Sequence, residues 1–103
     1  MVKLIYTVNA SIDLNSIFLY ISNDSVVNAK RFVRLLKSHV KALKEFPEKG
    51  RQISPERFPT LRQVLYKSYK IIYTYDANKI TIHVITHQSR LNINIDALKQ
   101  FYI

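Results

Sequence analysis

The chain has 103 residues and carries 16 Lys and Arg against 7 Asp and Glu, which gives a formal net charge of +9. This length suits one domain with one core, and the apolar fraction of 48% excludes an intrinsically disordered chain. The absence of cysteine excludes a disulfide framework and a thiolate metal site, while the large positive charge predicts an anionic partner.

Neither a targeting segment nor a membrane segment is recognisable in the sequence. The opening residues MVKLIYTV are too short for the apolar region of a signal peptide. No apolar run approaches the roughly 18 residues that a membrane-spanning helix needs. We therefore expect a single domain over residues 1–103 in a soluble, cytoplasmic protein without membrane association.

The N-terminal part of the chain predicts a strand followed by a helix. Residues 2–8 (VKLIYTV) are rich in β-branched and aromatic side chains, which favour a strand. Asn9 or Ser11 is suited to cap the next helix. The buried face of that helix is predicted from apolar residues at helical spacing, namely Leu14, Ile17, Phe18 and Ile21. The turn-forming residues 23–25 (NDS) then interrupt the pattern.

A second helix is predicted over residues 25–45, because two separate rows of side chains recur every three or four residues. The apolar row contains Ala29, Phe32, Leu36, Val40 and Leu43. The basic row contains Lys30, Arg34, Lys37, Lys41 and Lys44. The basic row is either a solvated helix face or a surface for an anionic partner. Pro47 and Gly50, the one glycine of the chain, predict the end of the helix within a loop over residues 45–59.

The C-terminal half changes to the alternation that is typical of strands. Three strands are predicted over residues 61–66, 69–75 and 79–87, joined by tight turns that lack glycine. In the last strand, alternation assigns Ile80, Ile82 and Val84 to one face and Thr81, His83 and Ile85 to the other. We therefore expect an α+β fold with two N-terminal helices packed on a mainly antiparallel four-stranded sheet. The conformation of the tail, residues 91–103, stays open.

The sequence contains few motifs of cofactor or metal chemistry. There is no glycine-rich phosphate loop, no HExxH zinc motif and no carboxylate pair, so we expect no cofactor and no metal. His39 and His83 lie within regular elements and are interpreted as structural. His87 lies at the end of the last predicted strand, three residues before Arg90, where an imidazole is able to transfer protons near neutral pH.

The basic residues of the predicted sheet are the stronger candidates for a binding site. We expect side chains from separate strands to converge on one sheet face and to bind phosphate or a target there, and these are Arg51, Arg62, Lys70 and Arg90. Tyrosines are interleaved with them and either stack on bases or pair across strands. For Tyr73 and Tyr75 we favour pairing within the core.

Five segments in this order resemble the RelE/ParE toxin superfamily of type II toxin–antitoxin systems, which includes plasmid stabilisation proteins. The segments are DLNSIFLYI, ALKEFPEKGR, FPTLR, YKIIYTY and ITIHVITHQSR, and the resemblance covers about residues 1–90. It implies the β-α-α-β-β-β element order. It also implies a toxin that inhibits growth and is neutralised by a cognate acidic antitoxin.

The resemblance implies two alternative activities. RelE-like members are metal-independent endonucleases that cut mRNA on the ribosome, and this activity would assign catalytic roles to Lys70, His87 and Arg90. ParE-like members act on DNA gyrase and lack that catalytic set. Lys70 stands where the ribonucleases commonly have an arginine, and lysine loses the forked contact to phosphate. FPTLR, with Arg62, looks more like ParE members, so the ParE-like action on gyrase is the leading hypothesis. A third hypothesis is a non-toxic, basic nucleic-acid-binding module.

Overall fold

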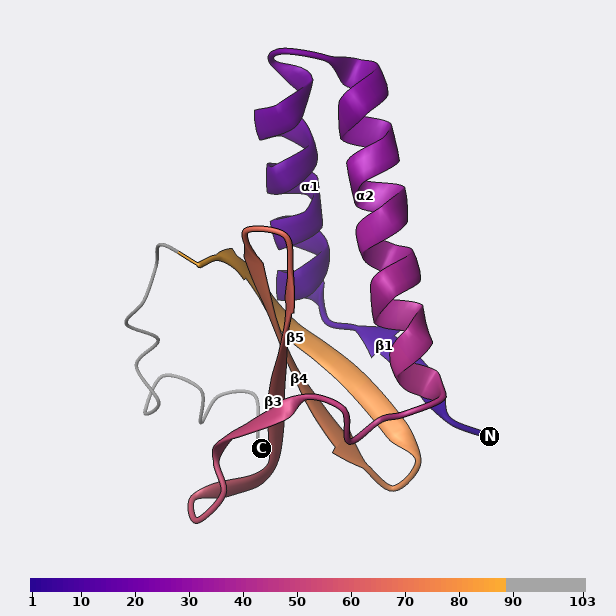
Figure 1. Ribbon diagram of the computed structural model, residues 1–103, viewed down its shortest axis with the longest axis vertical. Coiled ribbons are helices and arrows are strands. Elements are labelled where there is room, and N and C mark those ends of the chain that lie inside the picture. The colour runs from indigo at the N-terminus through magenta and orange to yellow at the C-terminus, as the bar shows by residue number, and fades with distance from the viewer. Residues whose placement is uncertain (89–103) are drawn as a thin grey trace.

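The computed structural model describes residues 1–88 and has the α+β architecture expected from the sequence (Figure 1). Two helices form a hairpin and are packed on a sheet. The elements in chain order are β1 (Lys3–Tyr6), α1 (Val8–Ser22), α2 (Val26–Lys41), the 3-10 turn η1 (Ala42–Lys44), β2 (Arg51–Ser54), β3 (Phe58–Tyr66), β4 (Tyr69–Asp76) and β5 (Lys79–His87). Arg90 and the tail over residues 91–103 lie outside the described residues. Within residues 1–88, no helix is long and apolar enough to span a membrane.

Both helices begin at a hydroxyl side chain that accepts a hydrogen bond from a backbone amide. Thr7 Oγ1 accepts from the amide of Ala10 at 3.0 Å, so α1 begins earlier than the predicted caps at Asn9 or Ser11. Ser25 Oγ accepts from the amide of Asn28 at 3.1 Å and starts α2. Each bond satisfies one amide that the first helical turn would otherwise leave without a partner.

The sheet has five strands in the order β1-β5-β4-β3-β2, one more than the four expected. Strand β1 is parallel to β5, and the other neighbours are antiparallel. The additional strand, β2, lies within the predicted loop and pairs at the sheet edge with β3. Its four residues, RQIS, are exposed or half-buried and show no apolar alternation, so the sequence pattern could not reveal them.

The tight turns between the last three strands contain backbone conformations that usually favour glycine. Lys67 has φ 53°, and Ala77 and Asn78 have φ 50° and 59°. Positive φ at these positions matches the twist of a hairpin, and Asn tolerates it better than Ala or Lys. The expected hairpins are therefore confirmed, at a small cost in backbone strain.

A β-bulge in β5 overturns the predicted division of that strand between two faces. Ile72 pairs with Val84 whereas Tyr73 pairs with Ile82, so His83 is the extra residue of the bulge. As a result Ile85, and not Val84, joins Ile80 and Ile82 in the main core. Val84 instead packs against the smaller apolar cluster on the other side of the sheet. One extra residue reverses the alternation beyond it.

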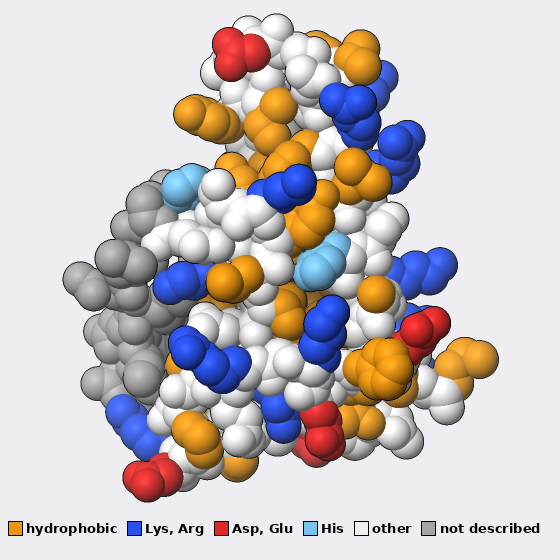
Figure 2. All heavy atoms as spheres, in the orientation of Figure 1, with side chains coloured by type: hydrophobic (Ala, Val, Ile, Leu, Met, Phe, Trp, Pro, Cys, Tyr) orange, Lys and Arg blue, Asp and Glu red, His pale blue; other side chains and the backbone are white. Residues whose placement is uncertain are grey.

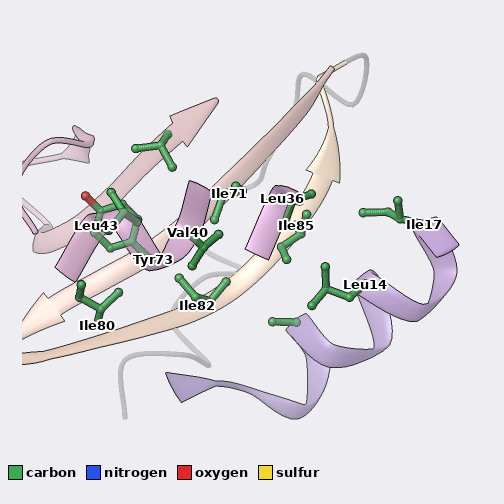
Figure 3. Packing of buried hydrophobic residues seen from close by; sticks show 12 residues of the cluster. Leu14, Ile17, Leu36, Val40, Leu43, Ile71, Tyr73, Ile80, Ile82 and Ile85 are labelled. Carbon is green, nitrogen blue, oxygen red and sulfur yellow. The ribbon is translucent and has the colours of Figure 1, made fainter. Parts of the chain in front are cut away.

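The main core lies between the helical hairpin and the sheet (Figure 3). Apolar residues of α2 and η1 meet residues of β4 and β5, and the fully or almost fully buried members include Leu36, Val40, Leu43, Ile71, Tyr73, Ile80 and Ile82. On the opposite side of the sheet, Phe58, Leu61 and Ile72 form a smaller cluster. The predicted apolar rows of both helices are thus confirmed as core-facing, except that Phe18 is half-buried and does not belong to the core cluster.

Candidate functional site

The strand register decides which of the predicted site residues can act together. Tyr69 pairs with Tyr66 on one side and with His87 on the other, and all three lie on the sheet face that the helices cover. Lys70 is the next residue and pairs with Leu65 and Thr86. Because successive side chains of a strand point to opposite faces, Lys70 and His87 lie on opposite sides of the sheet.

Arg62 lies on the helix-covered face but is directed at the backbone. It pairs with Tyr73 across β3 and β4, and its Nη1 donates to the carbonyl oxygens of Glu48 at 3.0 Å and Gly50 at 2.7 Å. The Tyr73 hydroxyl donates to the carbonyl of Pro47 at 2.8 Å and accepts from the Gly50 amide at 2.9 Å. Arg62 and Tyr73 therefore anchor the segment that leads into β2.

The environment of Tyr73 explains its protonation state. Burial raises the pKa of its hydroxyl above the ordinary value of 10.0, against smaller lowering effects from the Gly50 hydrogen bond and the Arg62 guanidinium. The phenol stays neutral near pH 7 and is able to act as donor and acceptor at once. The expectation that Tyr73 belongs to the core is confirmed.

Arg51 is the first residue of the edge strand β2 and is exposed. It pairs with Gln63, which places it on the same face as Lys70. The described residues therefore do not form the single cationic cluster expected from the sequence. Arg62 and His87 lie on the helix-covered face, Arg51 and Lys70 lie on the other, and Arg90 is outside the described residues.

Aromatic rings and two histidines gather where α2 meets the turn between β3 and β4. The rings of Tyr66 and Tyr69 each lie 5.7 Å from the ring of Phe32, centroid to centroid, in edge-to-face geometry. His39 lies 5.1 Å from Tyr66, and His87 lies 5.4 Å from Tyr69. Such contacts stabilise the packing of α2 on the sheet, which accounts for His39 without a chemical role.

His83 is the extra residue of the bulge and is 5% exposed. Its Nε2 lies 3.0 Å from Thr74 Oγ1, and burial lowers its pKa below the ordinary 6.5. The imidazole is therefore neutral at physiological pH. A structural role, as expected from the sequence, agrees with this burial.

His87 also borders a groove between α1 and the end of β5. The groove has a volume of about 650 Å³ and is lined by Asp13, Ser16, Ile17, Tyr20, Ser68, Tyr69, Ile85, Thr86 and His87. Asp13 Oδ2 accepts a hydrogen bond of 2.9 Å from the backbone amide of Ile85. Since β1 pairs with β5 only as far as Ile82, this bond ties the continuation of β5 to α1. Within residues 1–88, no group of three or more His, Asp or Glu side chains is positioned to hold a metal ion.

The helical hairpin presents two exposed surfaces of different chemistry. The first, called the α1 apolar stripe here, consists of Val8, Ile12 and Leu19, which are 77%, 55% and 56% exposed. Their spacing places them on the side of α1 opposite its buried residues. The second, called the α2 basic ridge, consists of Lys30, Arg34, Lys37 and Lys41, all exposed. Figure 2 shows Lys and Arg side chains along the outer edge of the helical hairpin. The sequence pattern predicted these four residues of the basic ridge together with Lys44, which lies in η1 and is half-buried, but it did not predict the apolar stripe.

Comparison with known proteins places this fold among the toxins of toxin–antitoxin systems. The family model of the ParE toxin of the type II toxin–antitoxin system parDE matches residues 4–92, and the chain belongs to this family. A solved structure of the chromosomal ParDE toxin–antitoxin system from P. aeruginosa is similar in fold, with a TM-score of 0.70 and 22% sequence identity. The similarity covers 84% of this chain and 96% of that one. A search among curated proteins found no match.

Proposed function

We propose that this toxin arrests growth by a ParE-like action on DNA gyrase and that a cognate acidic antitoxin neutralises it. The observation that carries the proposal is membership of the ParE toxin family over residues 4–92. The net charge of +9 supports a target complex that contains a polyanion. The solved structure with the similar fold comes from a ParDE toxin–antitoxin system, which supports an antitoxin as the partner.

The alternative, a RelE-like ribonuclease, is less well supported by the geometry. Cleavage of a phosphodiester requires that the cation that stabilises the developing charge and the group that transfers the proton reach the same phosphate. Lys70 and His87 lie on opposite sheet faces, and Arg62 donates to two backbone carbonyls. Of the residues assigned to catalysis from the sequence, the two within residues 1–88, Lys70 and His87, thus lie too far apart in orientation to act on one phosphate.

The test compares the two activities with the same purified toxin. A supercoiling assay with gyrase and relaxed plasmid is expected to show blocked supercoiling or trapped cleaved DNA at micromolar toxin. Primer extension on mRNA in a translating extract is expected to show intact message. Cleaved message together with normal supercoiling would refute the gyrase proposal and support the ribonuclease.

The α1 apolar stripe is the surface that we assign to the antitoxin. Val8, Ile12 and Leu19 are exposed, and the one charged side chain of α1, Asp13, is bonded to the Ile85 amide. An uncharged apolar row on a helix fits the apolar face of a partner helix. Acidic residues on the same partner helix would be attracted by the positive charge of the toxin, which speeds association.

A pair of matched variants tests this surface. Ile12→Glu places a charge in the stripe and is expected to weaken antitoxin binding at least tenfold, because an apolar side chain that the antitoxin would cover is replaced by a charged one. Leu65→Glu is the control, since Leu65 is 54% exposed compared with 55% for Ile12 but lies on the sheet face away from the helices. Equal affinities of the two variants in calorimetric titration with the antitoxin would reject the assignment.

A further inference from the structure

The α2 basic ridge is an unusual surface for a helix whose only task is to cover a core. Helix α2 spans Val26–Lys41 and contains no Asp or Glu. Within residues 1–88, no ion pair joins Lys30, Arg34 or Lys41 to an acidic side chain. Lys37 has a different contact, with its Nζ 5.8 Å from the centre of the Tyr6 ring.

The ridge costs folding stability rather than adding to it. Lys30 and Arg34, Arg34 and Lys37, and Lys37 and Lys41 are successive neighbours on one helix face. Like charges three or four residues apart destabilise a helix by about 0.2–0.5 kcal/mol per pair, so the row costs roughly 1 kcal/mol. Stability therefore does not explain the ridge, whereas its concentrated positive charge would attract a polyanion.

We infer that the α2 basic ridge binds the phosphate backbone of duplex DNA. With a rise of 1.5 Å per residue, the row from Lys30 to Lys41 is about 16 Å long. Along the DNA axis the phosphates of one strand are spaced by about 3.4 Å, so this length is that of roughly five phosphates. A helix holds its cations in a straight, rigid row, which matches the regular backbone of a duplex.

The composition of the ridge also indicates which kind of partner it binds: duplex DNA, a single-stranded nucleic acid or a protein. A protein partner needs apolar or aromatic anchors at the centre of the contact. The exposed apolar residues of α2 are Val26 and Val27, which precede the ridge, and Leu35, which lies on another face of the helix, so none of them stands between the ridge cations. A single-stranded nucleic acid is bound mainly by stacking on aromatic side chains. The two aromatic rings of α2 already pack against the sheet, Phe32 against Tyr66 and Tyr69, and His39 against Tyr66. A duplex needs neither kind of anchor.

The inference goes beyond the proposed action on gyrase, because it concerns a direct contact with DNA. Fluorescence anisotropy with a 20-base-pair DNA duplex, measured over a range of salt concentrations, tests it. The variant Lys30→Gln/Arg34→Gln/Lys41→Gln is expected to bind at least tenfold more weakly than the unchanged toxin. The slope of log affinity against log salt is expected to fall by about 2.7, since each phosphate contact contributes about 0.9.

The matched control removes the same charge elsewhere. Lys3→Gln/Lys49→Gln/Lys79→Gln changes three exposed lysines outside α2. This control is expected to change the slope by less than about 1. Urea unfolding of the ridge variant is expected to show unchanged or higher stability, so weaker binding cannot be attributed to unfolding.

Three results would overturn the inference. The first is an equal loss of DNA affinity in the ridge and control variants. The second is tighter binding of single-stranded DNA or duplex RNA than of duplex DNA. The third is no measurable binding of the DNA duplex at low salt. Gyrase inhibition that persists in the absence of DNA binding would reject this inference alone and leave the proposed function intact.

Discussion

Replacement of Gly50 by alanine is expected to be among the most destabilising single-methyl changes in the toxin. An added Cβ would lie 2.5 Å from the Tyr73 hydroxyl oxygen, 2.7 Å from its Cε1 and 2.9 Å from the Gln63 carbonyl oxygen. Gly50 has no positive φ, so the penalty comes from space and not from backbone conformation. The ring of Tyr73 is fully buried, which leaves it little freedom to move away.

The expected magnitude follows from two losses. Overpacking a buried site costs about 1–3 kcal/mol. Displacing Tyr73 also weakens its bonds to the Gly50 amide and the Pro47 carbonyl, each contributing about 1 kcal/mol. We expect Gly50→Ala to lower the free energy of unfolding by about 3 kcal/mol. For a domain of this size the melting temperature would fall by about 12–24 °C.

A double-mutant cycle with Tyr73→Phe, followed by urea unfolding and circular dichroism, identifies the mechanism. Tyr73→Phe removes the nearest clashing atom and both hydrogen bonds, so these cannot be lost a second time when Gly50→Ala is added. The double variant is therefore expected to be at least about 1 kcal/mol more stable than the sum of the single effects predicts. Additive effects, or a Gly50→Ala change below about 0.5 kcal/mol, would refute this reasoning.

Three further predictions concern single side chains. Burial lowers the pKa of His83, so the stability contributed by its neutral imidazole is complete above pH 6.5 and is lost as the pH falls below that value. His83→Gln should flatten this acid dependence of the free energy of unfolding in urea titrations. An unchanged pH profile would count against this role of His83. Burial raises the pKa of Tyr6 to about 12, and its hydroxyl has no hydrogen-bond partner within residues 1–88. Stability is thus complete below pH 10 and falls from there towards pH 12, and Tyr6→Phe should remove this loss in thermal melts at alkaline pH without destabilising the toxin at pH 7. Arg62→Ala should lower stability by roughly 1–2 kcal/mol through its two carbonyl contacts, and Lys70→Ala by less than about 0.5 kcal/mol; the reverse order in urea unfolding would show that the roles are misassigned.

The periodicity of apolar residues in the sequence was sufficient to predict the helices and strands that form the core. The apolar row from Ala29 to Leu43 and the alternating segments after residue 60 bury their side chains as expected, except in β5 beyond the bulge at His83. These signals are local, because burial on one face of a helix or strand imposes its period directly on the sequence. The order of such segments was also sufficient to indicate the toxin superfamily, which the family match over residues 4–92 confirms.

The arrangement of the candidate site depended instead on pairing between distant segments. The edge strand β2 has no pattern of its own, and its position follows from contact with β3. The bulge at His83, which exchanges the faces of Val84 and Ile85, exists only relative to β4.

Sequence by itself thus determined the two helices, the hairpin-linked strands, the basic ridge and the family. Only the tertiary structure separated Lys70 from His87 and directed Arg62 to the carbonyls of Glu48 and Gly50. The physical reason is that a strand carries its own alternation, whereas the face that each side chain occupies is set by register, bulges and packing against partners far along the chain.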